Sequence, residues 1–346
     1  MNKDIIKYLR HLLYMTIPFG CFVMLYVILD PFEVIWHYDD YFASRKVHIS
    51  LNHFNVSISN FDNRYNEEKW NSFIVGTSRS RYWEISDWEK LLPKGSKGYH
   101  IDHSGGSLYS LTKKFEYLDA KGVPIKNVLI IMDTNMLENP LPSYSHTSYT
   151  PPQMLGYENI LSYHLTNFKA FCDFEFLCVF FKELIHPNMQ PSSLELSSGE
   201  YFSYNPYNNQ IKQDVIETEI RKGRYYTKEL VSAMFVRNQY PDSISPILIG
   251  DKQMKQLSII SNIIRKNDAD CRVVISPRYN KIRFNANDIK VLEEKFGKGK
   301  VYDYSGVNPI TTDYHNYYEH SHYRPIVTKK IMDEIYNDKV KFSTFK

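Results

Sequence analysis

Short apolar runs that end in small or polar residues recur along the chain and predict buried strands. The clearest run is Val128–Met132, and shorter ones lie at Phe73–Val75 and Gly98–Ile101. Two more follow late in the chain, at Cys271–Pro277 and Lys300–Tyr304. Runs without polar interruption, such as Phe73–Val75 and Val128–Met132, are typical of strands that are covered on both faces of a parallel sheet.

Helical patterns separate these runs. They begin at about Ser86, where a capping residue is followed by early acids, and recur over residues 107–120, 251–265, 285–296 and 325–337. Alternation of strands and helices predicts an α/β domain with a parallel sheet, which we place at 71–346.

The alternation breaks between residues 137 and 250, which we interpret as a long insertion. It contains Pro, Ser and Tyr clusters and one apolar helix candidate, Phe168–Ile185. Insertions of this length in a compact domain are usually lids or binding regions. Residues 30–70 are polar and irregularly patterned and predict a connector, with a short helix near Tyr38–Ser44.

The N-terminal segment predicts a membrane anchor. Residues 12–29 contain no charged side chain and are long enough to cross a bilayer, and Lys3, Lys7 and Arg10 precede them. Basic residues on the N-terminal side predict that residues 1–11 are cytoplasmic and that the remainder of the chain is extracytoplasmic. A cleaved signal peptide is the main alternative, but no small-x-small cleavage site follows the run.

The composition narrows the classes of partner. The net charge is +3, and no basic stripe with interleaved aromatic residues is present, so nucleic acid is not an expected partner. The four cysteines show no metal-ligand spacing, and pairing of Cys172 with Cys178 is left open by the sequence.

Three polar motifs follow predicted strands or precede the last helix. They are Gly76–Ser80, Asp133–Asn135 and the stretch that contains Glu319 and His322. In open α/β sheets, ligands bind outside the carboxyl ends of the strands. Each motif alone also fits a simpler interpretation: a turn, an Asx turn or helix N-cap, and a polar surface loop.

The spacing of Glu319 and His322 suits acid–base chemistry. A carboxylate three residues before an imidazole can hold it in one tautomer and stabilise its charged form. Histidine is the usual proton carrier near neutral pH. A metal site is the alternative, since Asp313, His315 and His320 crowd the same segment, but no HExxH motif occurs.

Together the motifs resemble those of the SGNH/GDSL hydrolase superfamily over about residues 73–336. The sequence has Gly-Thr-Ser where Gly-Asp-Ser is common, Gly105-Gly106 after the second strand, Thr134-Asn135 after the third, and Glu319-x-x-His322 before the last helix. The resemblance implies a flavodoxin-like three-layer α/β/α fold.

The resemblance also implies site roles. Ser78 is then the nucleophile, His322 the base and Glu319 the acid that orients it. The oxyanion hole is formed by the Ser78 amide, the amide of Gly106 or Gly105, and the Asn135 side chain. Asp313 is a second candidate for the orienting acid, and His320 a second candidate for the base.

An anchored domain of this type resembles bacterial inner-membrane proteins of envelope glycan O-acetylation. We therefore expect a serine-dependent esterase or O-acyltransferase, acting on an acylated saccharide or lipid in the periplasm, with a membrane-bound acyl donor as a further partner. No metal and no cofactor are expected. The alternative is an inactive member that serves as a glycan-binding or assembly partner of a membrane complex.

Overall fold

The computed structural model describes residues 3–41, 49–186, 203–235 and 243–337. The chain divides into two compact units. One unit combines Met1–Leu51 with Tyr157–Glu200, and the other combines Asn52–Gly156 with Tyr201–Lys346. Each unit is described by itself.

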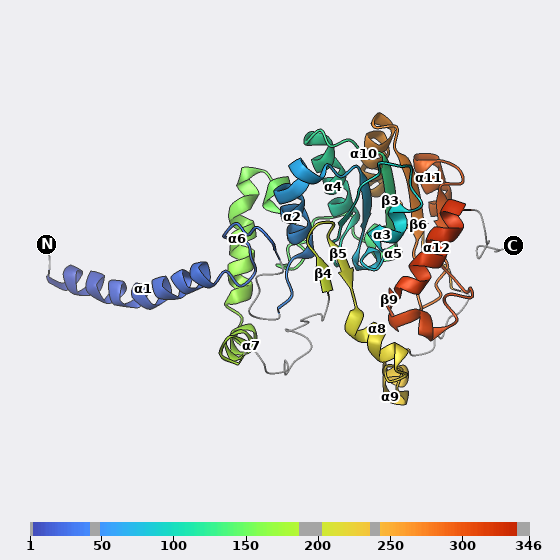
Figure 1. Cartoon of the computed structure of the whole chain (residues 1–346). Coiled ribbons are helices and arrows are strands. Elements are labelled where there is room, and N and C mark those ends of the chain that lie inside the picture. Colours follow the sequence, from blue (N-terminus) through green and yellow to red (C-terminus); the bar gives the residue numbers. More distant parts are fainter. Residues whose placement is uncertain (1–2, 42–48, 187–202, 236–242, 338–346) are drawn as a thin grey trace. The chain divides into compact units, whose positions relative to one another are not determined.

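The larger unit contains the predicted parallel sheet (Figure 1). Its five strands lie in the order β2-β1-β3-β6-β7, and all neighbouring strands are parallel. The strands are β1 (Ser72–Gly76), β2 (Gly98–Ile101), β3 (Asn127–Met132), β6 (Asp270–Ile275) and β7 (Val301–Asp303). The prediction of an α/β fold with a parallel sheet is confirmed.

Helices cover both faces of the sheet. Successive strand side chains point to opposite faces, so Phe73 and Val75 of β1 belong to one apolar core while Ile74 belongs to the other. The first core is completed by α2 (His53–Glu68), α4 (Leu108–Ala120), α10 (Asp251–Lys266) and α11 (Ala286–Phe296). The second is completed by α3 (Ile85–Glu89) and α12 (Pro325–Asn337).

Helix α2 lies where the sequence predicts an irregular connector. Asn52 caps it by accepting hydrogen bonds from the amides of Phe54 and Asn55. Its first nine residues are all buried, polar and apolar alike, so the helix has little of the one-sided pattern that reveals a surface helix. The short helix predicted near Tyr38–Ser44 does not begin before residue 42, and residues 42–48 lie outside the described part.

Shorter elements surround the carboxyl ends of the strands. Helix α5 (Thr134–Glu138) follows β3, and a hairpin of β8 (Tyr317–Glu319) and β9 (His322–Tyr323) precedes α12. The region predicted as an insertion supplies further elements of this unit. These are β4 (Ser203–Asn205), β5 (Gln210–Lys212), α8 (Asp214–Arg221) and α9 (Lys228–Met234), together with the short 3₁₀ turn η2 (Pro152–Met154). A further 3₁₀ turn, η3 (Tyr314–Asn316), lies outside this region.

The smaller unit is helical, with α1 (Lys3–Leu29), α6 (Tyr157–Phe171) and α7 (Phe174–Ile185). Aromatic rings hold α1 to α6: the centroids of Phe22 and Phe171 lie 5.1 Å apart, and those of Tyr26 and Phe168 lie 5.2 Å apart. Part of the apolar run at 12–29 is therefore used in packing within this unit. Both Cys172 and Cys178 are free thiols.

The anchor prediction needs correction in one respect. A helix does include residues 12–29, as the uncharged run predicts. However, within the described ranges no helix combines the length and the apolar character that a membrane span needs. The predicted transmembrane anchor is therefore not confirmed.

Candidate active site

Ser78 opens a short 3₁₀ turn, η1 (Ser78–Ser80), directly after β1. The strand ends in Gly76 because nothing larger fits there. A Cβ on Gly76 would lie 2.7 Å from the Ile131 carbonyl oxygen and 2.8 Å from Cβ of Ser80. Ser80 donates from its hydroxyl to the Thr77 carbonyl at 2.8 Å, which tightens the turn. Because Gly76 has no side chain, the chain can turn close to β3, and this turn places Ser78 at the end of the strand.

The structure brings Ser78, His322 and Glu319 together. His322 Nε2 lies 2.8 Å from Ser78 Oγ, and its other ring nitrogen, Nδ1, is hydrogen-bonded to Glu319 Oε1. The three groups come from chain positions as far as 244 residues apart. A hydroxyl, an imidazole and a carboxylate in this order form the arrangement of a charge-stabilised proton carrier beside a nucleophile.

Glu319 is held in place as a charged acceptor. Its second oxygen, Oε2, accepts a hydrogen bond from the Ser321 amide at 2.6 Å. Burial disfavours its charge, but the contacts with His322 and the Ser321 amide outweigh burial, and the pKa of Glu319 lies below its usual value. A carboxylate that stays ionised can keep the His322 Nδ1–H pointed at itself.

The two alternative residues occupy other positions. Asp313 accepts hydrogen bonds from the His315 amide at 3.0 Å and pairs with the His315 ring at 2.8 Å. His320 reaches Glu319 Oε2 at 3.4 Å, and its side chain is 70% exposed. Of the two candidate acids and the two candidate bases, Glu319 and His322 form the hydrogen-bonded connection to Ser78.

The hairpin that carries His322 is braced from two sides. On one side, Arg79 Nε donates to the Ser321 carbonyl at 3.1 Å. On the other, Glu217 of α8 accepts from Arg324 at 2.9 Å and 2.7 Å and from the Tyr318 hydroxyl at 2.8 Å. Helix α8 lies in the region predicted as an insertion, so this region helps to position the imidazole.

Asp133 joins the end of β3 to the Ser78 turn. It is 1% exposed and caps α5 by accepting from the Met136 amide at 3.0 Å. Its other oxygen accepts from the Thr77 hydroxyl at 3.0 Å and from Arg79 at 2.6 Å. Burial alone would raise the pKa of Asp133, but Arg79 and the Met136 amide bring it below its usual value. The N-cap that the sequence allows at this motif is therefore Asp133 and not Asn135.

Asn135 is exposed in the first turn of α5. Its side-chain oxygen accepts from Arg278 at 2.9 Å and from the Thr134 hydroxyl at 3.4 Å. Among the described residues, no hydrogen bond engages the Asn135 NH₂ group, so it is available as a donor. Arg278, which follows β6, thus orients the side chain that the sequence analysis assigns to an oxyanion hole.

The amides of Gly105 and Gly106, which are the two candidate oxyanion donors in this loop, differ in their hydrogen bonding. The Gly106 amide donates to the His103 carbonyl at 3.0 Å and closes a turn. Gly105 is exposed with φ +69°, and among the described residues no hydrogen bond engages its amide. In this conformation Gly105, not Gly106, offers an available N–H.

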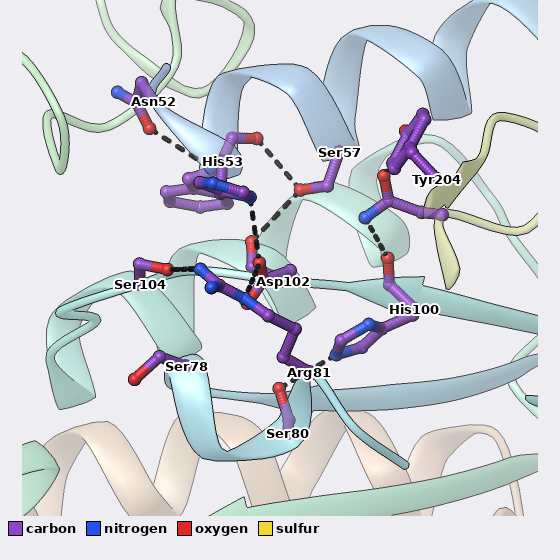
Figure 2. Close-up of polar contacts among 12 residues, drawn as sticks. Asn52, His53, Ser57, Ser78, Ser80, Arg81, His100, Asp102, Ser104 and Tyr204 are labelled. Carbon is purple, nitrogen blue, oxygen red and sulfur yellow. Dashed lines mark hydrogen bonds and ion pairs between the residues drawn. The ribbon is translucent and has the colours of Figure 1, made fainter. Parts of the chain in front are cut away.

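A buried polar network ties this loop to the Ser78 turn (Figure 2). Arg81 donates to the Ser104 hydroxyl, and its Nε lies 3.5 Å from Asp102 Oδ2. The same carboxylate oxygen lies 3.1 Å from His53 Nδ1, so Asp102 stands between His53 and Arg81 (Figure 2). Burial opposes ionisation of Asp102, but Arg81 and His53 lower its pKa well below the usual value.

Two further buried side chains support the strand ends. Lys114 donates to the carbonyls of Gly76 at 3.1 Å and Ile101 at 2.8 Å, which links β1 to β2, and burial lowers its pKa to about 7. His100 Nε2 lies 2.8 Å from the Ser80 hydroxyl, and burial lowers the pKa of His100 to about 4 (Figure 2). Neither residue touches Ser78 directly.

The sequence predicts none of the residues that support the site. Arg79 lies inside the serine motif, Arg81 directly follows it, and Arg278 directly follows a predicted strand. None of the three has a recognisable role in the sequence as long as its partner in the fold is unknown. Asp102 and His53 are equally ordinary in sequence. As for a metal, no group of three or more His, Cys, Asp or Glu residues suited to holding an ion occurs in the part of the chain that the structure describes.

Comparison with known proteins identifies no family. No family model matches the chain, and no curated protein matches it.

Proposed function

We propose that the protein is a serine-dependent esterase or O-acyltransferase of the SGNH/GDSL type. The observation that carries the proposal is the contact of 2.8 Å between His322 Nε2 and Ser78 Oγ, with Glu319 on the other ring nitrogen. The strand order β2-β1-β3-β6-β7 supports it, because it corresponds to the flavodoxin-like order and places residue 78 after the strand next to the edge.

In the first half of the reaction, Ser78 Oγ attacks the carbonyl carbon of an ester while His322 Nε2 takes the hydroxyl proton. The tetrahedral intermediate then collapses. The ester's alcohol leaves with the proton returned by His322, and the acyl group stays on Ser78. Glu319 stabilises the imidazolium that forms between these two proton transfers.

In the second half, water or a hydroxyl of an acceptor attacks the acyl–Ser78 carbonyl, and His322 again takes the attacking proton. Release of Ser78 Oγ, which regains its proton, gives a free acid or a new ester. We propose acetyl as the acyl group and an envelope saccharide or lipid as the acylated substrate, by analogy with SGNH-type proteins of envelope glycan O-acetylation.

Three donors suit the negative charge that develops on the carbonyl oxygen. The Ser78 amide opens a 3₁₀ turn, and no hydrogen bond to another described residue engages it. The Gly105 amide and the NH₂ group of Asn135 are the second and third donors. Such groups act strongly because they are already oriented before the charge appears.

Hydrolysis of 4-nitrophenyl acetate tests this proposal. Wild type is expected to release nitrophenol faster than buffer, and Ser78→Ala is expected to abolish the difference. Ser232→Ala is the matched control and is expected to keep the wild-type rate, since it removes an exposed hydroxyl on α9 that donates to the Glu229 carbonyl of the same helix. Equal rates in wild type and Ser78→Ala would contradict the proposal. They would favour the inactive glycan-binding alternative.

A further inference from the structure

Arginines gather around the candidate site, and all but one of those described there have a carboxylate partner. The pairs are Arg79 with Asp133 at 2.6 Å, Arg81 with Asp102 at 3.5 Å and Arg324 with Glu217 at 2.7 Å. Arg278 differs. Its hydrogen bonds go from one terminal nitrogen to the Thr134 hydroxyl at 2.6 Å and to Asn135 Oδ1 at 2.9 Å, both uncharged acceptors.

The remaining donors of Arg278 form a vacant fork. Among the residues that the structure describes, neither Nε nor the second terminal nitrogen of Arg278 has a partner. These two nitrogens have the parallel N–H geometry that binds both oxygens of a carboxylate or phosphate.

The position of Arg278 is costly for a cation. The side chain is half-buried, and burial together with the nearby Arg79 lowers its pKa, although Asp133 and Glu138 oppose this shift. A buried charge without an ion-paired partner is normally avoided in proteins. Groups kept in such places are candidates for binding an opposite charge from outside.

Arg278 also lies at the carboxyl ends of the strands, as the reacting groups do. It follows β6, while Asn135 follows β3 and Ser78 follows β1, and these three strands are adjacent. Through Asn135, the guanidinium is one side chain removed from the carbonyl oxygen of the substrate in the proposed reaction.

We propose that Arg278 binds a carboxylate or phosphate group on the alcohol portion of the ester substrate, and that it selects anionic over neutral esters. This inference depends on the proposed function for the position of the ester. The anion is assigned to the alcohol portion because the proposed acyl group, acetyl, carries no charge.

Three phenyl acetates that differ only in one ring substituent test the selection. They are 3-acetoxybenzoate, 3-acetoxyphenyl phosphate and the neutral methyl 3-acetoxybenzoate. Hydrogen bonds between two charged groups are stronger than those between neutral groups, so Arg278→Gln is expected to lower kcat/KM for an anionic ester about tenfold or more relative to the neutral one. The two anionic esters distinguish a carboxylate site from a phosphate site.

Two variants provide controls. Arg278→Lys keeps the charge but loses the fork and is expected to retain part of the preference. Arg265→Gln removes one positive charge from the exposed last turn of α10, which precedes the amino end of β6. This variant is expected to leave the preference unchanged. A loss of kcat/KM that is equal for anionic and neutral esters in Arg278→Gln would overturn the proposal while leaving the esterase function intact.

Binding gives a readout that needs no turnover. Titration calorimetry with phenyl phosphate and benzoate is carried out on Ser78→Ala and on Ser78→Ala with Arg278→Gln. The proposal predicts binding of at least one anion to the single variant and a loss of about tenfold or more in the double variant. No anion binding to the single variant, or equal affinity in both, would overturn it whether or not the esters are hydrolysed.

Discussion

The carboxylate of Asp133 lies 2.6 Å from the Arg79 guanidinium, and both side chains are buried. Asp133 stands at the end of β3, and Arg79 is the residue after Ser78. Arg79 reaches further, to the Ser321 carbonyl beside His322. One ion pair therefore connects the serine turn, the start of α5 and the histidine hairpin. The proposed chemistry requires these three segments in a fixed relative position.

Breaking this pair is expected to destabilise the fold strongly. Arg79→Met or Asp133→Asn leaves the other charge buried without its partner, which typically costs about 3–5 kcal/mol. Urea unfolding of both single variants and of the double variant measures the coupling. The double variant is expected to lose much less than the sum of the two single losses. Additive losses would mean that the two side chains do not depend on each other.

Asn135→Ala separates catalysis from stability. The side chain is exposed, so the free energy of unfolding is expected to change by less than about 1 kcal/mol. Loss of one oxyanion donor is expected to lower kcat by about 100-fold or more for 4-nitrophenyl acetate. Unchanged kcat with normal folding would remove Asn135 from the oxyanion hole.

Glu319 is expected to act through its charge. Glu319→Gln keeps the side-chain length but cannot stabilise the imidazolium, so kcat falls, while Glu319→Asp retains more activity because it keeps the carboxylate. His322→Gln is expected to lower kcat by about 100-fold or more. The check is the kcat of the three variants under one condition. Equal activity in the Gln and Asp variants of residue 319 would argue against the charge.

The buried imidazoles predict a dependence of stability on pH. Burial lowers the pKa of His100 to about 4 and that of His103 to about 3, against 6.5 ordinarily. Below pH 6.5 the unfolded chain therefore binds more protons than the folded one, and the free energy of unfolding decreases as the pH falls toward about 4.

Each such group contributes at most about 1.4 kcal/mol per pH unit. His100→Gln keeps a polar side chain near Ser80 but does not titrate, so it is expected to show a shallower decrease between pH 6.5 and 5 in urea unfolding. The same slope in wild type and His100→Gln would show that this imidazole is not held neutral.

The strands and the residues of the proposed triad were predictable, because their signals are local. An uninterrupted apolar run such as Val128–Met132 predicts a buried strand by itself. The spacing of Glu319 and His322 predicts their contact, and the placement of Ser78 after a strand predicts which edge of the sheet it occupies. The geometry agrees with these expectations, while the chemistry they imply stays a prediction.

The supporting groups were not predictable, because their meaning is non-local. Asp102 acquires its role only through Arg81 and His53, which lie 21 and 49 residues earlier in the chain. Gly105 and Gly106 are adjacent and alike in sequence, and only the turn closed by the Gly106 amide distinguishes them. Helix α2 was not predicted from the sequence, because its buried face includes polar residues that form hydrogen bonds inside the unit.

Identifying the reactive serine tests the proposed triad directly. The intact protein is treated with a fluorophosphonate, digested, and the modified peptide is identified by mass spectrometry, in wild type and in His322→Gln. We expect a single adduct on Ser78 that forms much more slowly when His322 is replaced. An adduct on another serine, or no adduct on the folded wild-type protein, would contradict it.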